Sequence, residues 1–316
     1  MSDPFEAFGD VDDLAGDLAS PDPTVRRLAV IALAETSSWQ VVPHLVAAIA
    51  DEAAEVREQA ARALGEFDGH DVGQALARAV TDAVPEVALA AAESLAELRD
   101  PAAGQALLVL AGHESSFVRT AIFRGLKALQ IEASLPPAIA ALGDGDPDVR
   151  VQAVGVIGYL KRRETLPALI GATRDSHAEV RLAAVKALSF ADHSDEAAAA
   201  VSAALKDSAW EVRAAAAETI GRLGARASAA ALVAALADPL WQIRQKALQS
   251  LGRLGARDAV AAIIPVLGDD NPSLRKDAAA ALGEIADPAA RTALAARARD
   301  ADPDVRKTVA WALARL

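Results

Sequence analysis

The 316 residues include no cysteine, one methionine and one tyrosine, and 32 basic against 44 acidic side chains give a formal net charge of −12. Without cysteine the chain has no disulfide, no thiolate metal site and no cysteine nucleophile. Its acidic start does not resemble a signal peptide, and no apolar run approaches the ~20 residues that cross a bilayer, so we expect a soluble, cytoplasmic protein.

One short pattern recurs along the chain ten times, about every 31 residues. It starts with an apolar lead residue that is followed by arginine in nine copies, with Ala88 as the exception. The lead residues are Val25, Val56, Val87, Val118, Val149, Val180, Val212, Ile243, Leu274 and Val305. A leucine or isoleucine stands eight positions after every lead residue. Such a period predicts a stack of small units, none of which buries its apolar face alone.

The copy at 143–160 indicates how one unit folds. Asp146 is a good N-cap for a helix, and Pro147 suits the first helical position, where no N–H is needed. Val149, Ala153 and Ile157 then fall on one apolar stripe of that helix. A second apolar helix precedes each such helix, so each unit is predicted to be two antiparallel helices, here A and then B.

In chain order, residues 1–10 are predicted to form an N-terminal tail or partial cap, and residues 11–316 a single repeat solenoid. The fold class is all-α, an α-solenoid of about ten 31-residue antiparallel helix pairs. The chain ends at Leu316 without an obvious polar cap, which terminal units normally need. Either another segment or subunit associates with this C-terminal end, or the end frays.

The arginine after each lead residue needs a partner, because its neighbours are expected to be buried. An aspartate stands five residues before the lead residue in eight units; Ser20 and His113 are the exceptions. If each arginine pairs with the aspartate of the following unit, Ala88 and His113 become one missing pair. We therefore predict a structural Arg–Asp ladder between consecutive units. Its pairs are Arg26–Asp51, Arg57–Asp82, Arg119–Asp144, Arg150–Asp175, Arg181–Asp207, Arg213–Asp238, Arg244–Asp269 and Arg275–Asp300.

The motif Asp-x-Asp-Pro-Asp-Val-Arg-x-x-Ala-x-x-x-Ile-Gly at 144–158, with its nine copies, resembles HEAT-like repeats of the short bacterial and archaeal type found in phycobilin-lyase-like proteins. The resemblance covers about residues 11–316. It implies a right-handed superhelix in which the B helices line the concave side. It also implies that positions 2, 3, 6 and 10 after the lead residue form the surface that contacts a partner. Ala88 and His113 depart from the pattern and mark the third-to-fourth junction as irregular.

Two aromatic residues, Tyr159 and Phe190, stand ten positions after the lead residue in the middle units. Gly155 leaves room beside them, and Arg124 and Lys186 flank them. Exposed aromatic residues bordered by arginine are typical contact anchors, so we predict a partner-binding patch on the concave face. The alternative is that Phe190 packs into the core at the end of its helix. The predicted patch comprises Tyr159, Phe190, Arg124, Lys186, Arg222 and Arg253.

Trp210 and Trp241 both stand two residues before a lead residue, in consecutive units. They are interpreted either as a secondary binding ledge or as a hydrophobic cover over the turn between helices A and B.

Charge is unevenly divided along the chain. Residues 1–158 carry 10 basic and 25 acidic side chains, whereas residues 159–316 carry 22 and 19. This polarity either orients charged partners or reflects solubility and drift. The acidic half argues against a nucleic-acid-binding surface along the whole length.

No residues are predicted to be catalytic, and no metal or cofactor site is expected. The five histidines lie at unlike repeat positions, and Asp144, Asp146 and Asp148 lack the glycine and glutamate of a calcium loop. The favoured function is a non-enzymatic scaffold that binds a protein or peptide on the concave face. One alternative, from the resemblance alone, is a lyase or chaperone for a tetrapyrrole-bearing protein; another is a HEAT-like DNA alkylpurine glycosylase.

Overall fold

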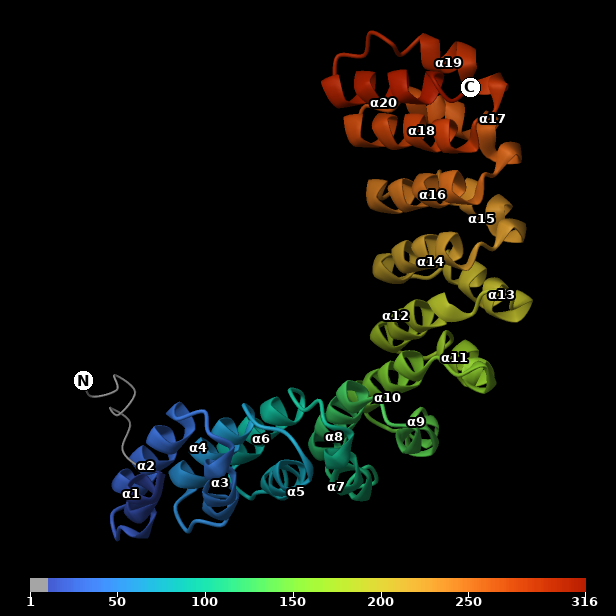
Figure 1. The fold of residues 1–316 in the computed structure, drawn as a ribbon. Helices are drawn as coiled ribbons and strands as arrows, with labels where there is room; N and C mark the ends of the chain where they lie inside the picture. Colours follow the sequence, from blue (N-terminus) through green and yellow to red (C-terminus); the bar gives the residue numbers. More distant parts are fainter. Residues whose placement is uncertain (1–10) are drawn as a thin grey trace, which may run out of the picture. The chain divides into compact units, whose positions relative to one another are not determined.

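The structure is a computed structural model that describes residues 11–316, so the predicted tail at residues 1–10 lies outside the described residues. Within the described range it contains twenty α-helices and no strand, which confirms the all-α fold. The helices alternate between a generally shorter A helix and a B helix, and they form ten consecutive pairs (Figure 1).

The A helices are α1 (Val11–Gly16), α3 (Val42–Ala48), α5 (His70–Ala79), α7 (Gly104–Val109), α9 (Leu135–Ala141), α11 (Leu166–Ala172), α13 (Asp195–Ala204), α15 (Ala229–Ala235), α17 (Val260–Ile263) and α19 (Arg291–Ala295). The B helices are α2 (Pro23–Glu35), α4 (Ala54–Leu64), α6 (Pro85–Leu95), α8 (Ser116–Leu129), α10 (Pro147–Leu160), α12 (Ala178–Ala187), α14 (Trp210–Leu223), α16 (Trp241–Leu254), α18 (Pro272–Ile285) and α20 (Pro303–Leu313).

Several B helices start at a side-chain cap of the kind predicted for Asp146. The side chains of Asp22, Asn271 and Asp302 accept a hydrogen bond from a backbone N–H in the first turn, and a proline follows each of them. Asp146 does the same for Asp148 N at 2.9 Å. These contacts satisfy donors that the first turn leaves without an intrahelical partner.

The apolar stripe of the B helices forms the core. Nine of the ten lead residues are buried, and so are nine of the ten residues eight positions later. The two exceptions, Val25 and Leu313, lie in the first and last repeats and are half-buried. A terminal repeat has a neighbour on one side only, which accounts for both exceptions.

The chain divides into two compact units, Met1–Leu160 and Lys161–Leu316, each with five helix pairs. Within each unit every B helix packs against the next B helix, so these helices lie side by side in a row (Figure 1). We call the exposed surface made by positions 2, 3, 6 and 10 after the lead residues the B-helix face. One continuous solenoid over residues 11–316 stays a prediction.

None of the helices in the described range combines the length and apolar character that a transmembrane span requires.

Candidate functional site

The structure pairs the arginine after the lead residue with the aspartate of the next repeat. In the second repeat, Nε and Nη2 of Arg57 donate to the two carboxylate oxygens of Asp82 at 2.7 and 3.0 Å. Nη1 of the same arginine donates to the backbone carbonyl oxygens of Asp51 and Glu52 at 2.9 and 3.0 Å. The planar guanidinium can reach a carboxylate and a turn at once. Each pair therefore links the A–B turn of one repeat to the A–B turn of the next by hydrogen bonds.

The same two-pronged contact joins six of the eight predicted pairs. These are Arg26–Asp51, Arg57–Asp82, Arg119–Asp144, Arg181–Asp207, Arg213–Asp238 and Arg275–Asp300. Arg244 is looser, because only its Nη2 reaches Asp269, at 3.5 Å, while its buried Nε has no acceptor among residues 11–316. The pair Arg150–Asp175 would link the two units and stays a prediction.

In several ladder pairs, the arginine and the aspartate stabilise each other's charged form. The hydrogen bond from Arg57 holds the pKa of Asp82 below its usual range, and Asp82 in turn raises the pKa of Arg57. Hydrogen bonds from the paired arginines lower the pKa of Asp51, Asp144 and Asp207 in the same way. Both partners therefore stay charged near neutral pH.

The two aromatic residues of the predicted patch differ in their surroundings. Tyr159 lies on α10, with 56% of its surface exposed. Phe190 is half-buried in a 3-10 turn (Leu188–Phe190), because α12 ends at Ala187. Tyr159 belongs to the first unit and Phe190 to the second, and their joint use stays a prediction.

The room predicted beside Gly155 is filled by the protein itself. A Cβ atom added to Gly155 would lie 2.8 Å from Cδ of Lys127. Nζ of Lys127 donates to Gln152 Oε1 at 3.1 Å, and burial lowers the pKa of this lysine. The glycine therefore accommodates the side chain of a neighbouring lysine. Arg124 and Lys186, the predicted flanking cations, are both exposed.

Trp210 and Trp241 are the first residues of α14 and α16, and each is about two-fifths exposed. Trp241 borders a surface cavity of about 530 Å³ beside Arg244, the arginine of the loosened pair. This surrounding is compatible with a cover over the turn and with a binding ledge, so both interpretations stay open.

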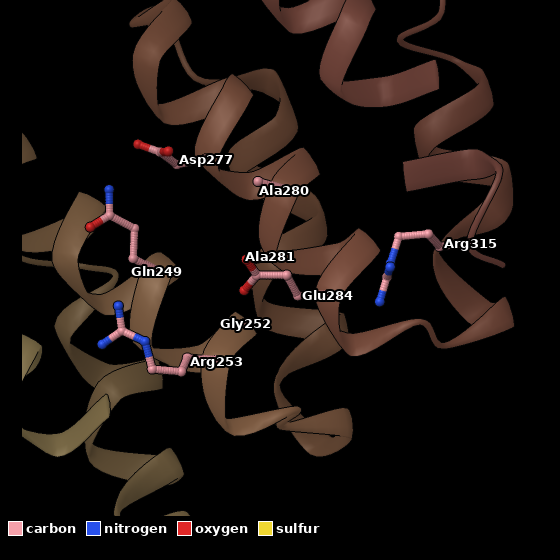
Figure 2. Close-up of a pocket in the computed structure, with 8 residues that line it drawn as sticks. All are labelled: Gln249, Gly252, Arg253, Asp277, Ala280, Ala281, Glu284 and Arg315. Carbon is pink, nitrogen blue, oxygen red and sulfur yellow. The ribbon is translucent and has the colours of Figure 1, made fainter. Parts of the chain in front are cut away.

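The second unit has a groove on its B-helix face, which we call the B-helix groove (Figure 2). Its volume is about 510 Å³, within the range of ~300–1,000 Å³ that ligand pockets occupy. The lining residues come from α16, α18 and the residues after α20. They are Gln249, Gly252, Arg253, Asp277, Ala280, Ala281, Glu284 and Arg315. Most of them stand 3, 6 or 10 positions after a lead residue, where the resemblance to HEAT-like repeats implies a partner surface.

Two arginines lie on opposite sides of Glu284 in this groove (Figure 2). Arg315 is held in place, since its Nε donates to Gly283 O at 2.9 Å and its guanidinium lies 5.0 Å from the ring centre of Trp311. Arg253 is exposed and forms no hydrogen bond within the described part of the chain. The groove therefore presents one fixed and one unengaged guanidinium.

Glu284 has an unusual electrostatic position. Burial raises its pKa above the usual range, although Arg253 and Arg315 act in the opposite direction. The burial follows from the close approach of two B helices, because a Cβ atom at Gly252 would lie 2.9 Å from Ala281 Cα. Gly252 thus lets α16 approach α18 and partly cover the carboxylate.

Arg222, a predicted patch residue, already has an intramolecular partner. It forms an ion pair with Glu218 on its own helix, and Lys246 of the next B helix reaches the other carboxylate oxygen of Glu218 at 3.1 Å. The hydrogen bond from Lys246 lowers the pKa of Glu218. Arg222 is exposed beside this cluster, whereas Arg253 is the predicted cation that lines the groove.

Within residues 11–316, no three histidine, aspartate or glutamate side chains come together in an arrangement that could hold a metal ion. Asp144 and Asp146 are used instead in the ladder and in capping, as the sequence predicts.

Gln249, Asp277 and Glu284 are groove residues that the sequence analysis did not select. Each stands 3, 6 or 10 positions after its lead residue, so the repeat register together with the resemblance to HEAT-like repeats could have pointed to them. The depth of the groove comes from Gly252 and two neighbouring alanines, which are ordinary helix-packing residues in the sequence.

Comparisons with known proteins agree with this architecture. A family described as HEAT repeats matches residues 12–95, 135–221 and 229–314, and a PBS lyase HEAT-like repeat matches residues 212–238. No curated protein matches the chain.

Three solved structures illustrate the likeness of the fold. An engineered protein shares 20% identity with a TM-score of 0.55, over 97% of this chain and 98% of its own. The E. coli protein YibA shares 16% with a TM-score of 0.52, over 90% and 97%. Kap95p, from a study of its binding to RanGDP, shares 14% with a TM-score of 0.63; the match covers 96% of this chain and 50% of Kap95p. The family match extends over most of the described repeats, and the chain therefore belongs to the HEAT repeat family.

Proposed function

We propose that the protein is a non-enzymatic interaction scaffold that binds a protein or peptide partner on its B-helix face. The B-helix groove is the observation that carries this proposal, because it brings together charged and polar side chains, among them Arg253 and Glu284, whose hydrogen-bonding groups no other described residue uses. The fold likeness to Kap95p, which binds RanGDP, supports the proposal by analogy.

The groove favours a partner segment that carries both a carboxylate and a hydrogen-bond donor. The guanidinium of Arg253 can bind a carboxylate, and Arg315 offers the nitrogens that Gly283 does not use. No donor within the described residues reaches the carboxylate of Glu284, so a partner N–H or ammonium group there would gain a charge-assisted hydrogen bond. A peptide with an acidic side chain next to a donor fits this arrangement.

Selection from a random peptide display library on the immobilised protein tests the proposal. We expect enriched peptides to carry an acidic residue and to bind Arg253→Glu about tenfold more weakly or worse. Arg291→Glu is the matched control, because Arg291 is an exposed arginine on the A helix α19. Equal loss in both variants, or no loss in either, contradicts the groove as the binding site.

The predicted aromatic patch needs its own variant. If Tyr159 and Phe190 contribute to the contact, changing both to alanine reduces capture of a crosslinked partner from source cells without changing the circular dichroism of the protein. Tyr159 is exposed and Phe190 half-buried, so we expect Tyr159→Ala alone to account for most of the loss.

The two enzymatic alternatives are tested with the same preparation. A lyase or chaperone of tetrapyrrole-bearing proteins would shift the absorbance of an added bilin. A glycosylase would retard duplex DNA in a salt-sensitive manner, since phosphate contacts release counterions. The strongly acidic first half disfavours this second alternative.

A further inference from the structure

The missing pair of the Arg–Asp ladder leaves a pocket at the junction of the third and fourth repeats. Ala88 stands where the other repeats have arginine, and His113 stands where the next repeat would supply aspartate. A surface pocket of about 440 Å³ lies there, lined by residues 80–83 before α6, the first turn of α6 and the start of α8. We call it the vacant-arginine pocket.

The walls of this pocket are those that hold an arginine elsewhere. In the flanking repeats Nη1 of Arg57 donates to Asp51 O and Glu52 O, and Nη1 of Arg119 donates to His113 O and Glu114 O, all at 2.7–3.0 Å. The equivalent acceptors here are the carbonyl oxygens of Asp82 and Ala83. Ala88 cannot donate to them, and no other donor in the described residues forms a hydrogen bond with either oxygen.

His113 caps the turn as the aspartate does in other repeats, but it cannot form the aspartate's ion pair with an arginine. Its Nδ1 accepts the backbone N–H of Ser115 at 3.1 Å, as Asp51 Oδ1 accepts that of Ala53. A backbone N–H can only donate, so the neutral ring carries its proton on Nε2. The turn is thus still capped, but there is no carboxylate to hold a guanidinium from within the chain.

Apolar surface surrounds the entrance. Leu89 is 52% exposed and Phe117 is 43% exposed, and both line the pocket together with Pro85. Exposed apolar side chains around a recess are typical of contact sites for a partner. The half of the chain that contains the pocket carries 25 acidic against 10 basic side chains, which attracts a cationic segment.

From these observations we infer that the vacant-arginine pocket binds an arginine side chain of a partner protein, with an apolar residue next to that arginine. The guanidinium donates to Asp82 O and Ala83 O, its aliphatic stem packs beside Ala88, and the apolar neighbour contacts Leu89 and Phe117. This site lies in the first unit and does not rest on the B-helix groove of the second unit.

The test is a nuclear magnetic resonance titration with the capped peptide Gly-Ser-Arg-Leu-Ser-Gly. Two matched peptides replace its arginine with citrulline, which keeps the shape without the charge, or with norleucine, which is apolar. We expect saturable shifts of the Ser115 and Leu89 amide signals, and binding by the arginine peptide about tenfold tighter than by either matched peptide. Equal binding by the citrulline or norleucine peptide would overturn the inference.

The decisive variant combines Ala88→Arg with His113→Asp and so rebuilds the pair that the other junctions have. We expect it to abolish the peptide-induced shifts while raising the midpoint of thermal unfolding, which separates occupation of the pocket from loss of the fold. Arg291→Glu, on the A helix α19 of the other unit, should leave the titration unchanged. If the rebuilt protein binds the peptide as the wild type does, the pocket is not the site.

Discussion

The two units use the same ladder chemistry on different backgrounds of charge. The first half of the chain has 15 more acidic than basic side chains, and the second half has three more basic than acidic ones. Nevertheless, Arg119–Asp144 in the first unit and Arg181–Asp207 in the second have the same donor–acceptor distances, 2.7 and 2.8 Å. The positions that determine the fold are therefore constant, and the charge difference resides in positions that packing leaves free.

The largest expected effect tests whether the core is equivalent in the two units. Leu95 and Leu251 stand eight positions after their lead residues, and both are fully buried. Changing either to alanine should lower the free energy of unfolding by about 3 kcal/mol, measured by guanidinium denaturation. Leu89→Ala is the control, since this leucine is half-exposed and its loss should cost less than ~0.5 kcal/mol. A clear difference between the two buried sites would show that the repeats are not interchangeable.

A smaller effect comes from the ladder. Arg181→Ala removes the hydrogen bonds to Asp207 and to the turn of its own repeat, so we expect a loss of about 2 kcal/mol in the free energy of unfolding. Rebuilding the missing pair with Ala88→Arg and His113→Asp should act in the opposite direction, by about 1 kcal/mol. Urea denaturation of both proteins measures the two changes. A destabilised rebuilt protein would mean that the third-to-fourth junction has lost the geometry of the ladder.

The ladder also predicts sensitivity to acid. The paired aspartates have a folded-state pKa below their unfolded value, so they add stability above the unfolded pKa that is lost as the pH falls through the folded one. The free energy of unfolding should therefore drop as the pH falls below about 4. Denaturation series between neutral and acidic pH check this, with Asp207→Asn as the control. That variant should be less stable than the wild type at neutral pH and should lose less on acidification. If the free energy of unfolding of the wild type does not change with pH, the ladder aspartates do not contribute to its acid sensitivity.

The ladder register could be read from the sequence because its exceptions come in matched positions. Ala88 replaces the ladder arginine of the third repeat, and His113 replaces the ladder aspartate of the fourth. Only pairing between neighbouring repeats explains both replacements as the loss of a single pair. The helix pairs follow from the period of the lead residues and from capping prolines such as Pro147. These features depend on local geometry and repetition, which a single sequence displays.

The candidate site was less accessible because it depends on where helices end and how closely they approach. The sequence does not show that α12 stops before Phe190, or that Lys127 fills the space beside Gly155. Likewise, the sequence does not show that Gly252 brings α16 close enough to cover part of the exposed Glu284 side chain. The last two outcomes depend on how closely neighbouring helices approach each other, which the spacing of residues along the chain does not show.

The smallest expected effect compares Glu284, whose pKa is raised by burial, with the ladder aspartate Asp207, whose pKa is lowered by an arginine. Its folded-state pKa is raised by burial, so the charged form is disfavoured and the cost grows as the pH rises from the unfolded to the folded pKa. Glu284→Gln should therefore raise the free energy of unfolding at neutral pH, by less than about 1 kcal/mol because water screens the partly exposed group. The gain should vanish in acid, where Glu284 is protonated in both states. Asp207→Asn must show the opposite sign at neutral pH, since Arg181 stabilises the charged aspartate. If both variants destabilise the protein at neutral pH, Arg253 and Arg315 outweigh the burial of Glu284, and the groove holds an ion pair instead of an unsatisfied carboxylate.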